Sequence, residues 1–310
     1  MASPDVEVYP TVPAQRVDKN GINVREDVLY SDAKGREKAR LRRLADEVLE
    51  DFNDLLRRVL EPNEVVFGVA TAQAMPGVTA QFFGGGWHTY SLPRSVLIFT
   101  DRRVIVLRAR KRMSGWIWDR GIRTARWGDL QSVKSGGFSS RILTLQFRNG
   151  QKQAYWRFGR GELKKAVSLI DVLGPHGSGE LTAVGGMVSL CPGCFAVLSP
   201  RVYQCSGCGL QFKDEGNLLR RGLLVPGGAT FYVGATGLGA MRALSECILA
   251  AACVLIVLPI VFAGPEHRNV AGALLGGGFF LLLLAFDKTI AIVFSRQQVR
   301  DFLPAKTNRT

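Results

Sequence analysis

Four cysteines in two closely spaced pairs are the residues of this chain whose types and spacing are best suited to chemistry. Each pair has the form Cys-x-x-Cys, and ten residues separate the pairs, which consist of Cys191, Cys194, Cys205 and Cys208. Two pairs at this separation can supply four thiolates to one tetrahedral ion, an arrangement typical of structural zinc. Sulfur then fills every position, so no place remains for a catalytic water. The spacing predicts one structural Zn²⁺ per chain, with two disulfides or four metal-free thiols as the alternatives.

The segment between the two pairs predicts two short strands joined by a turn. Val197-Leu198 and Val202-Tyr203 would form these strands. Together with the cysteines, residues 190–213 resemble a zinc ribbon, and the resemblance implies a rigid staple or docking module. Phe195 stands where such ribbons commonly carry a glycine, so we expect the first turn to be less regular than the second, where Gly209 follows the cysteine pair.

The sequence offers no other set of residues that could catalyse a reaction. The three histidines, His88, His176 and His267, belong to different segments, and no Cys-His or Ser-His-Asp set converges. The Gly84-Gly85-Gly86 run lacks the Lys-Ser/Thr that follows in a phosphate-binding loop. We therefore expect a protein that is not an enzyme.

Charge is distributed unevenly along the 310 residues, whose formal net charge is +14. Residues 61–175 carry 18 basic and 7 acidic side chains, whereas residues 1–60 carry 11 and 12. A segment of this basicity attracts an anionic partner, either phospholipid headgroups or nucleic acid.

The N-terminal 60 residues divide into two parts. Residues 1–30 combine prolines with scattered charges and no sustained period, so we expect them to be largely disordered. Residues 31–60 place leucine, valine and phenylalanine at steps of three and four, which predicts one long amphipathic helix. This helix would pack on the following domain or, alternatively, pair with a partner helix and make an oligomer.

Residues 61–175 predict an antiparallel sheet closed by one helix. Asn149-Gly150 is the strongest hairpin signal among several turns. The expected strands are Glu64–Ala72, Ser95–Thr100, Val104–Arg108, Ile122–Trp127, Ile142–Phe147 and Gln151–Phe158. The closing helix covers Glu162–Leu173, before Gly174-Pro175 ends it. The pattern predicts an α+β roll or small barrel.

This ordered set of motifs resembles bacterial pleckstrin-homology-like domains. The resemblance depends on Ser95–Leu107, then Trp127–Val133, then the Asn-Gly hairpin and the last helix. It implies a binding module without catalytic residues. Two insertions, residues 73–94 and 109–121, depart from the family pattern.

Basic and aromatic residues gather in these two insertions. They are Phe82, Phe83, Trp87, Arg110, Lys111, Arg112, Trp116 and Trp118. Tryptophan beside arginine is typical of a membrane interface, so we expect this set to contact anionic lipid or a protein partner. The alternative is that the aromatic rings cover the open end of the barrel.

Two long apolar runs follow a Gly/Ser-rich linker at residues 176–189 and the ribbon. Ala243–Ala263 and Val270–Phe294 are each long enough to cross a bilayer. They predict a transmembrane hairpin over residues 243–295, and therefore an α+β multidomain membrane protein with two spans.

The segment before the hairpin, residues 214–242, is rich in glycine. Arg242 alone could not be the loop between two crossings, so residues 222–241 are expected to be a broken, interfacial or re-entrant piece. Pro226–Gly234 resembles the P-G-x-G-x-F-Y-x-G signature of a small family of two-helix membrane domains. A simple juxtamembrane turn is the alternative.

Basic residues predict the orientation of the hairpin. The flanks carry Arg220, Arg221, Arg242, Arg296, Arg300, Lys306 and Arg309, whereas the loop has only Arg268, offset by Glu266. Positive charge favours the cytoplasmic side, so both termini, including the tail at residues 296–310, should be cytoplasmic at the cell membrane. Cytosolic thiols stay reduced, which suits a thiolate zinc site.

Two charged residues inside the apolar runs should lie at equal depth. Glu246 precedes Gly264 by 18 residues, and Lys288 follows Val270 by 18 residues. We expect Glu246 and Lys288 to approach each other across the helix pair, with Gly272 and Gly276 facing the small residues Ala250–Ala252. Separate snorkelling of each side chain to the interface is the alternative.

Two classes of function remain open from the sequence. The first is a membrane-anchored binding or scaffold protein whose basic domain engages anionic lipid or a protein partner. The second is a membrane-tethered nucleic-acid-binding protein. The first is favoured because the ribbon has only Arg201 and Lys213 as basic residues, and because anchoring brings the basic domain to an anionic leaflet.

Overall fold

The fold is described from a computed structural model of the chain, which describes residues 16–75, 94–136, 141–176, 184–262 and 270–305. Two compact units meet in the sequence at Ser199 and Pro200. The first unit contains the sheet and the helices that cover it. The second contains the C-terminal helices.

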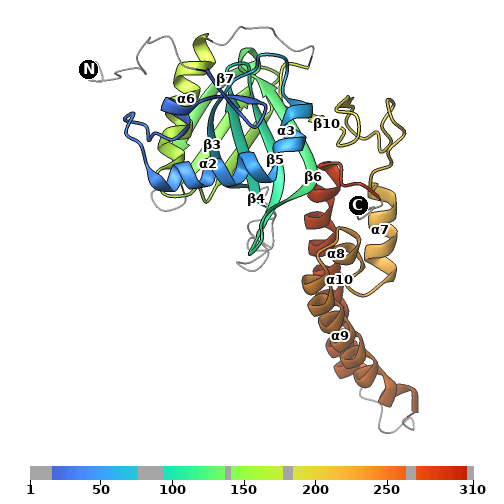
Figure 1. Ribbon diagram of the computed structural model, residues 1–310. Coiled ribbons are helices and arrows are strands. Elements are labelled where there is room, and N and C mark those ends of the chain that lie inside the picture. The colour runs from blue at the N-terminus through green and yellow to red at the C-terminus, as the bar shows by residue number, and fades with distance from the viewer. Residues whose placement is uncertain (1–15, 76–93, 137–140, 177–183, 263–269, 306–310) are drawn as a thin grey trace. The chain divides into compact units, whose positions relative to one another are not determined.

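A large, mainly antiparallel sheet dominates the first unit (Figure 1). Its hydrogen-bonded order is β11-β10-β6-β5-β4-β3-β9-β8-β7. The strands are β3 (Val66–Ala74), β4 (Arg94–Thr100), β5 (Arg103–Arg112), β6 (Gly115–Arg126), β7 (Leu130–Gly136), β8 (Ile142–Phe147), β9 (Lys152–Trp156), β10 (Val188–Leu190) and β11 (Val197–Leu198). A one-turn 3-10 helix, η1 (Trp127–Asp129), connects β6 to β7.

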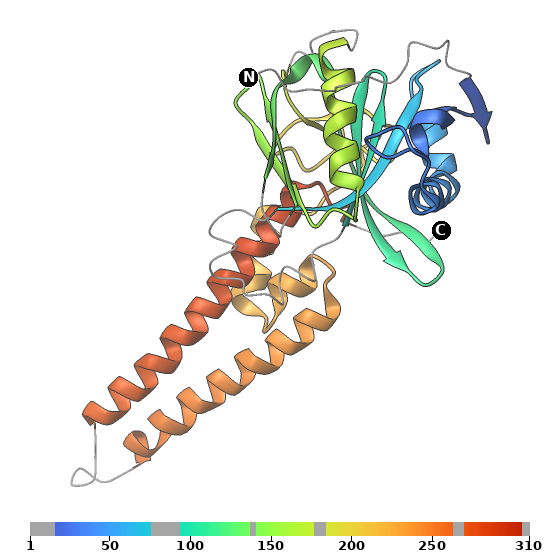
Figure 2. The ribbon, with the colours of Figure 1, turned by 90° about the vertical axis from the view of Figure 1, so that its left-hand side faces the viewer.

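Successive side chains of strands β3 to β6 are buried on alternate faces of the sheet, so each face carries an apolar core. In β4, Val96 and Ile98 join one apolar cluster, whereas Leu97 and Phe99 join the other. Successive side chains point to opposite faces of a strand, so a run that is buried on both faces is continuously apolar. The second cluster also contains side chains of β8, β9 and α6 (Glu162–His176), which closes that side of the sheet (Figure 2).

The first face is covered by two helices rather than by one long helix. These are α2 (Ala39–Asp51) and α3 (Asn53–Val59), which are separated at Phe52. Their apolar stripe, including Val48, Leu49 and Leu56, is buried in the same cluster as Ile98 and Leu107 of the sheet. The stripe is therefore occupied within the domain, which removes the sequence argument for a coiled-coil oligomer through residues 31–60.

The prediction of disorder is wrong for residues 16–29. They form β1 (Arg16–Lys19), β2 (Ile22–Arg25) and α1 (Glu26–Leu29). Strand β2 pairs with β1 and touches β3 at Val24 and Val66, and Ile22, Val24 and Leu29 are fully buried. Such short strands give no periodic signal in the sequence, and tertiary packing stabilises them. Residues 1–15 lie outside the described residues.

The structure shows the form of residues 109–121, the second predicted insertion. These residues continue β5 and β6 into one long hairpin, with Arg112 paired to Gly115 across a turn at Met113-Ser114. In the predicted linker, residues 177–183 lie outside the described residues, whereas Val188 and Ser189 belong to β10.

Four helices are found among the described residues of the second unit. They are α7 (Glu215–Leu224), α8 (Gly228–Tyr232), α9 (Thr236–Phe262) and α10 (Val270–Arg300). Helices α9 and α10 pack side by side as a hairpin (Figure 1). Both are long and apolar enough to cross a membrane. They extend beyond the predicted bounds, because α9 begins at Thr236 and α10 continues to Arg300.

Candidate functional site

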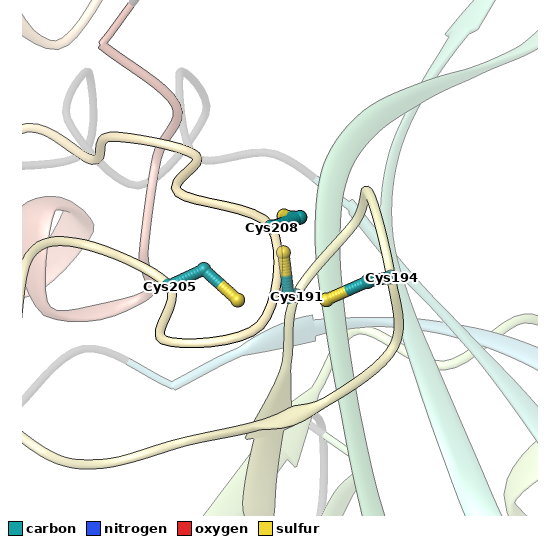
Figure 3. Close-up of side chains that lie close together, drawn as sticks. All are labelled: Cys191, Cys194, Cys205 and Cys208. Atoms are coloured by element: carbon teal, nitrogen blue, oxygen red, sulfur yellow. The ribbon is translucent and has the colours of Figure 1, made fainter.

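The four cysteines share one site, as their spacing predicts. Their sulfur atoms all lie within 4.8 Å of one another, and the side chains converge in Figure 3. Cys191 and Cys205 are buried, whereas Cys194 and Cys208 are exposed. None of these four cysteines is joined in a disulfide.

Two matching turns position these sulfurs. In the first, Cys191 N donates to Ala196 O (2.9 Å) and Phe195 N donates to Cys191 O (2.8 Å). In the second, Cys205 N donates to Leu210 O and Gly209 N donates to Cys205 O, both at 2.9 Å. Each turn thus brings two thiols of one Cys-x-x-Cys pair to the same side of the chain.

Phe195 does not make the first turn irregular. Phe195 and Gly209 hold the same position in the two turns and both have a left-handed backbone, with φ of 60° and 70°. A phenylalanine is strained there, by about 1 kcal/mol. The ring offsets this by packing on the buried cluster of the sheet, with the Arg58 guanidinium 5.0 Å from its centroid. The expectation of a less regular first turn is therefore wrong.

The cysteine group fits a metal ion. Tetrahedral thiolate coordination with bonds of about 2.3 Å needs sulfurs about 3.8 Å apart, so a shift of about 1 Å would close the site. Gly193 N donates to Cys191 Sγ at 3.4 Å, a contact that favours the thiolate. In the described part of the chain, this is the group of cysteine, histidine or acidic side chains that could hold an ion. Four sulfur ligands would make the ion structural.

The basic hairpin of β5 and β6 is attached to α2 near its tip. Trp116 N donates to Asp51 Oδ2 at 2.6 Å, and Lys111 forms an ion pair with Glu47. The Trp116 ring is buried in the sheet cluster, and Trp118 packs against that cluster. Trp116 is therefore a core residue and not an exposed membrane contact.

The very tip of the hairpin is exposed. Arg112 and Ser114 are exposed, and Met113 is fully exposed between them. Ile117 is exposed on the returning strand, while Arg110 pairs with Asp119 at 3.3 Å. The sequence did not single out Met113 and Ile117, because two isolated apolar residues among charges carry no periodic signal. Phe82, Phe83 and Trp87 lie outside the described residues.

A group of four charges joins the two long helices. Lys288 Nζ lies 2.8 Å from Glu246 Oε2, so the structure brings these two predicted partners together. Arg242 Nη1 lies 3.4 Å from Asp287 Oδ1 and donates to the Asp287 carbonyl at 3.0 Å. Glu246 is almost fully buried. The group is neutral overall, which lowers the cost of placing charge near lipid.

Sequence reasoning missed the second pair and misplaced the glycine contacts. Arg242, which the sequence places on the flank of the hairpin, lies inside α9 because that helix begins at Thr236. Gly276 faces Ile256 rather than Ala250–Ala252, and Gly277 faces Val257. The surroundings of Gly272 lie outside what the structure describes.

Comparison with known proteins adds no family. No family model and no curated protein matches the chain. Among solved structures, the C-terminal domain of an unknown protein from Leishmania infantum matches with a TM-score of 0.27 and 8% sequence identity. The match covers 42% of this chain and 97% of that chain. A likeness this low carries no argument about fold or function.

Proposed function

We propose that this chain is a non-enzymatic, membrane-anchored binding protein. Helices α9 and α10 would anchor it, a zinc ion would staple the four-cysteine segment, and the basic sheet domain would engage anionic lipid at the cytoplasmic face. Each part has a separate physical support.

The sheet domain supports the resemblance to pleckstrin-homology-like modules. Strands β3 to β6 form one antiparallel run, β7 to β9 form another, and α6 follows them in the chain. We read this succession of seven strands and a C-terminal helix as the arrangement that the family pattern implies. The helices α2 and α3 would then be an addition particular to this chain.

The observation that carries the lipid proposal is the exposed tip of the β5–β6 hairpin. It combines the fully exposed Met113 with three exposed basic residues that precede it on β5, Arg110, Lys111 and Arg112. Basic side chains beside an exposed apolar residue match the chemistry of a leaflet, with anionic headgroups outside and acyl chains beneath, although Arg110 and Lys111 also form ion pairs with Asp119 and Glu47. Each Lys or Arg near an anionic surface adds about 1 kcal/mol to binding.

Zinc is the ion we propose for the cysteine site. Four thiolates in two Cys-x-x-Cys turns are the donor set that Zn²⁺ prefers, and a reducing cytosol would keep them available. The cytoplasmic placement itself is proposed from the excess of basic residues on the flanks of the hairpin. Loss of the ion would free the two turns from each other.

A vesicle-binding experiment tests the lipid proposal. Residues 1–213 contain the sheet domain and the four cysteines but neither α9 nor α10, so any binding must come from the domain. We expect co-sedimentation with phosphatidylglycerol vesicles at low salt, little with phosphatidylcholine vesicles, and loss of binding at high salt. Binding to duplex or single-stranded nucleic acid in place of vesicles would instead support the nucleic-acid alternative.

A further inference from the structure

The turn between α7 and α8 exposes a group of large apolar side chains. We call it the apolar tip, and it consists of Leu223, Leu224, Val225 and Phe231. Leu224 is 72% exposed. Single exposed apolar residues are ordinary, but a contiguous group of them marks a surface that another apolar phase covers.

Polar and apolar residues separate along α7 from one end to the other. Its N-terminal half holds Glu215 and Asn217, and the Asp214 carboxylate caps it by accepting from Asn217 N at 2.7 Å. Arg220 and Arg221 follow in the middle and are exposed. The sequence from Gly222 to Tyr232 then contains no charge. The charged end and the apolar end are therefore distinct.

Contacts with α10 determine the depth of the apolar tip along the hairpin. Glu215 accepts from Arg300 Nε at 2.8 Å, near the C-terminal end of α10. Seven residues later, the Gly222 carbonyl accepts from Lys288 Nζ at 3.1 Å. Helix α7 thus runs antiparallel to α10, and its apolar end lies level with the group of four charges.

The distance along α9 places that level at one edge of a bilayer core. The backbone of Gly227 packs against Ala243. From Ala243 to Phe262 the helix rises about 28 Å. A hydrocarbon core is about 30 Å thick. If Phe262 marks the far edge of the core, the apolar tip lies where acyl chains begin on the near side.

We propose that the apolar tip inserts into the near leaflet, at the boundary between headgroups and acyl chains. Arg220 and Arg221 would then lie among anionic headgroups. The inference rests on the proposed function in one respect, namely that α9 and α10 cross a bilayer. The segment is a membrane-surface wedge attached to the hairpin, neither a third span nor a free turn.

Lipid is the occupant favoured by continuity of the surface. Phe231 packs against Gly239, so the apolar tip adjoins the beginning of α9. There Met241, Leu244 and Ile248 are also exposed, and they must face lipid if α9 crosses the bilayer. Arginine beside this surface complements anionic headgroups.

Photo-crosslinking in the full chain tests this placement. p-Benzoylphenylalanine would replace Leu224 in protein reconstituted into vesicles with labelled phosphatidylglycerol and phosphatidylcholine. Asn217, exposed at the polar end of the same helix, is the negative control. Leu282, which is 72% exposed on α10, is the positive control for a helix that spans the bilayer. We expect lipid adducts at 224 and 282, and at least tenfold fewer at 217.

The controls separate failure of this inference from failure of the membrane anchor. Adducts at 282 without adducts at 224 would overturn the insertion of the apolar tip and leave the anchor intact. Absence of adducts at both positions would overturn both. An adduct of twice the chain mass at 224, in place of lipid, would assign the surface to a second copy and overturn the lipid assignment.

A charge variant tests the headgroup contact separately. Arg220→Gln should lower the ratio of phosphatidylglycerol to phosphatidylcholine adducts at 224 about fivefold, the factor for one cation near an anionic surface. Arg43→Gln, an exposed arginine of α2, is the matched control and should leave the ratio unchanged. An equal ratio in all three proteins would contradict the role of Arg220.

Discussion

Lys165 is an ionisable side chain that the fold buries, and burial changes its pKa. Lys165 of α6 is almost fully buried and donates to the Leu29 carbonyl at 2.5 Å. Burial lowers the pKa of Lys165 to about 7, although Asp32 and Glu162 act in the opposite direction. The N-terminal segment is thus attached to α6 by an amine that is partly neutral near physiological pH.

This predicts a stability that rises with pH. The unfolded chain keeps the Lys165 proton up to about pH 10.5, whereas the folded chain loses it near pH 7. Between these values the unfolded state binds more protons, so the free energy of unfolding increases by up to about 1.4 kcal/mol per pH unit. Below pH 7 both states bind the proton, and the contribution is constant.

Lys165→Met should remove this slope. All five tryptophans lie within residues 61–175, so tryptophan fluorescence during urea unfolding of the full chain in detergent reports on the sheet domain. The measurement compares pH 7 with pH 9, and Lys164→Met, an exposed neighbour, is the control. The same slope in Lys165→Met as in the natural sequence would refute the prediction.

The four cysteines predict a defined metal content. We expect about one zinc per chain in the purified protein and almost none in Cys205→Ser, because loss of one thiolate opens the tetrahedral site. Cys247→Ser, which changes a cysteine of α9, should retain the metal. Elemental analysis with thiol titration measures both. Zinc-free natural protein with four titratable thiols in this segment would rule out the site.

At the scale of elements, a charge exchange tests the pairing of α9 with α10. In Glu246→Lys, the new lysine would lie beside Arg242 and Lys288, so that three cations are close together. This change should lower the stability by about 3 kcal/mol. Adding Lys288→Glu should restore much of that loss. Ser245→Lys, at an exposed neighbouring position, is the control. Thermal unfolding in detergent, followed by helical circular dichroism, measures the effects, and strictly additive changes would exclude a direct pair.

The sequence was sufficient for elements whose signal is local or periodic. Ser95–Thr100 and Ile142–Phe147 lie within strands, and Glu162–Leu173 lies within α6. The cysteine site was also predictable, because ligand spacing within two tight turns depends on neighbours in the sequence. The periodicity of strands and helices and the spacing of the cysteines can both be recognised without knowledge of tertiary contacts.

Elements that depend on distant contacts were missed. Strand β2 is stabilised by Val66 and by the cluster beneath α2, and nothing in its four residues indicates this. The long β5–β6 hairpin contains Arg110, Lys111 and Arg112, which suggest a loop until Glu47 and Asp119 provide their partners. Helix α7 was not predicted, because its sequence is rich in glycine. One of these glycines, Gly222, permits close packing against Ile292.

For the whole molecule, the proposed topology predicts where reporters are active. Alkaline phosphatase, which is active only outside the cytoplasm, should be active when fused after Gly264 and inactive when fused after Thr310. Fusion after Ser199 is the cytoplasmic control, provided that its expression is matched. Activity after Thr310 without activity after Gly264 would show the opposite orientation.

The central claim is that the β5–β6 tip of the basic domain contacts anionic lipid, and one vesicle titration tests it most directly. The domain in residues 1–213 would be compared with Arg112→Glu/Met113→Glu at the tip and with Arg160→Glu, an exposed site before α6. We expect the tip variant to bind phosphatidylglycerol vesicles at least tenfold more weakly, because it loses a cation, gains two anions and loses its apolar contact. The Arg160→Glu protein should lose no more than about fivefold. Equal binding by the tip variant and the natural sequence would contradict the account.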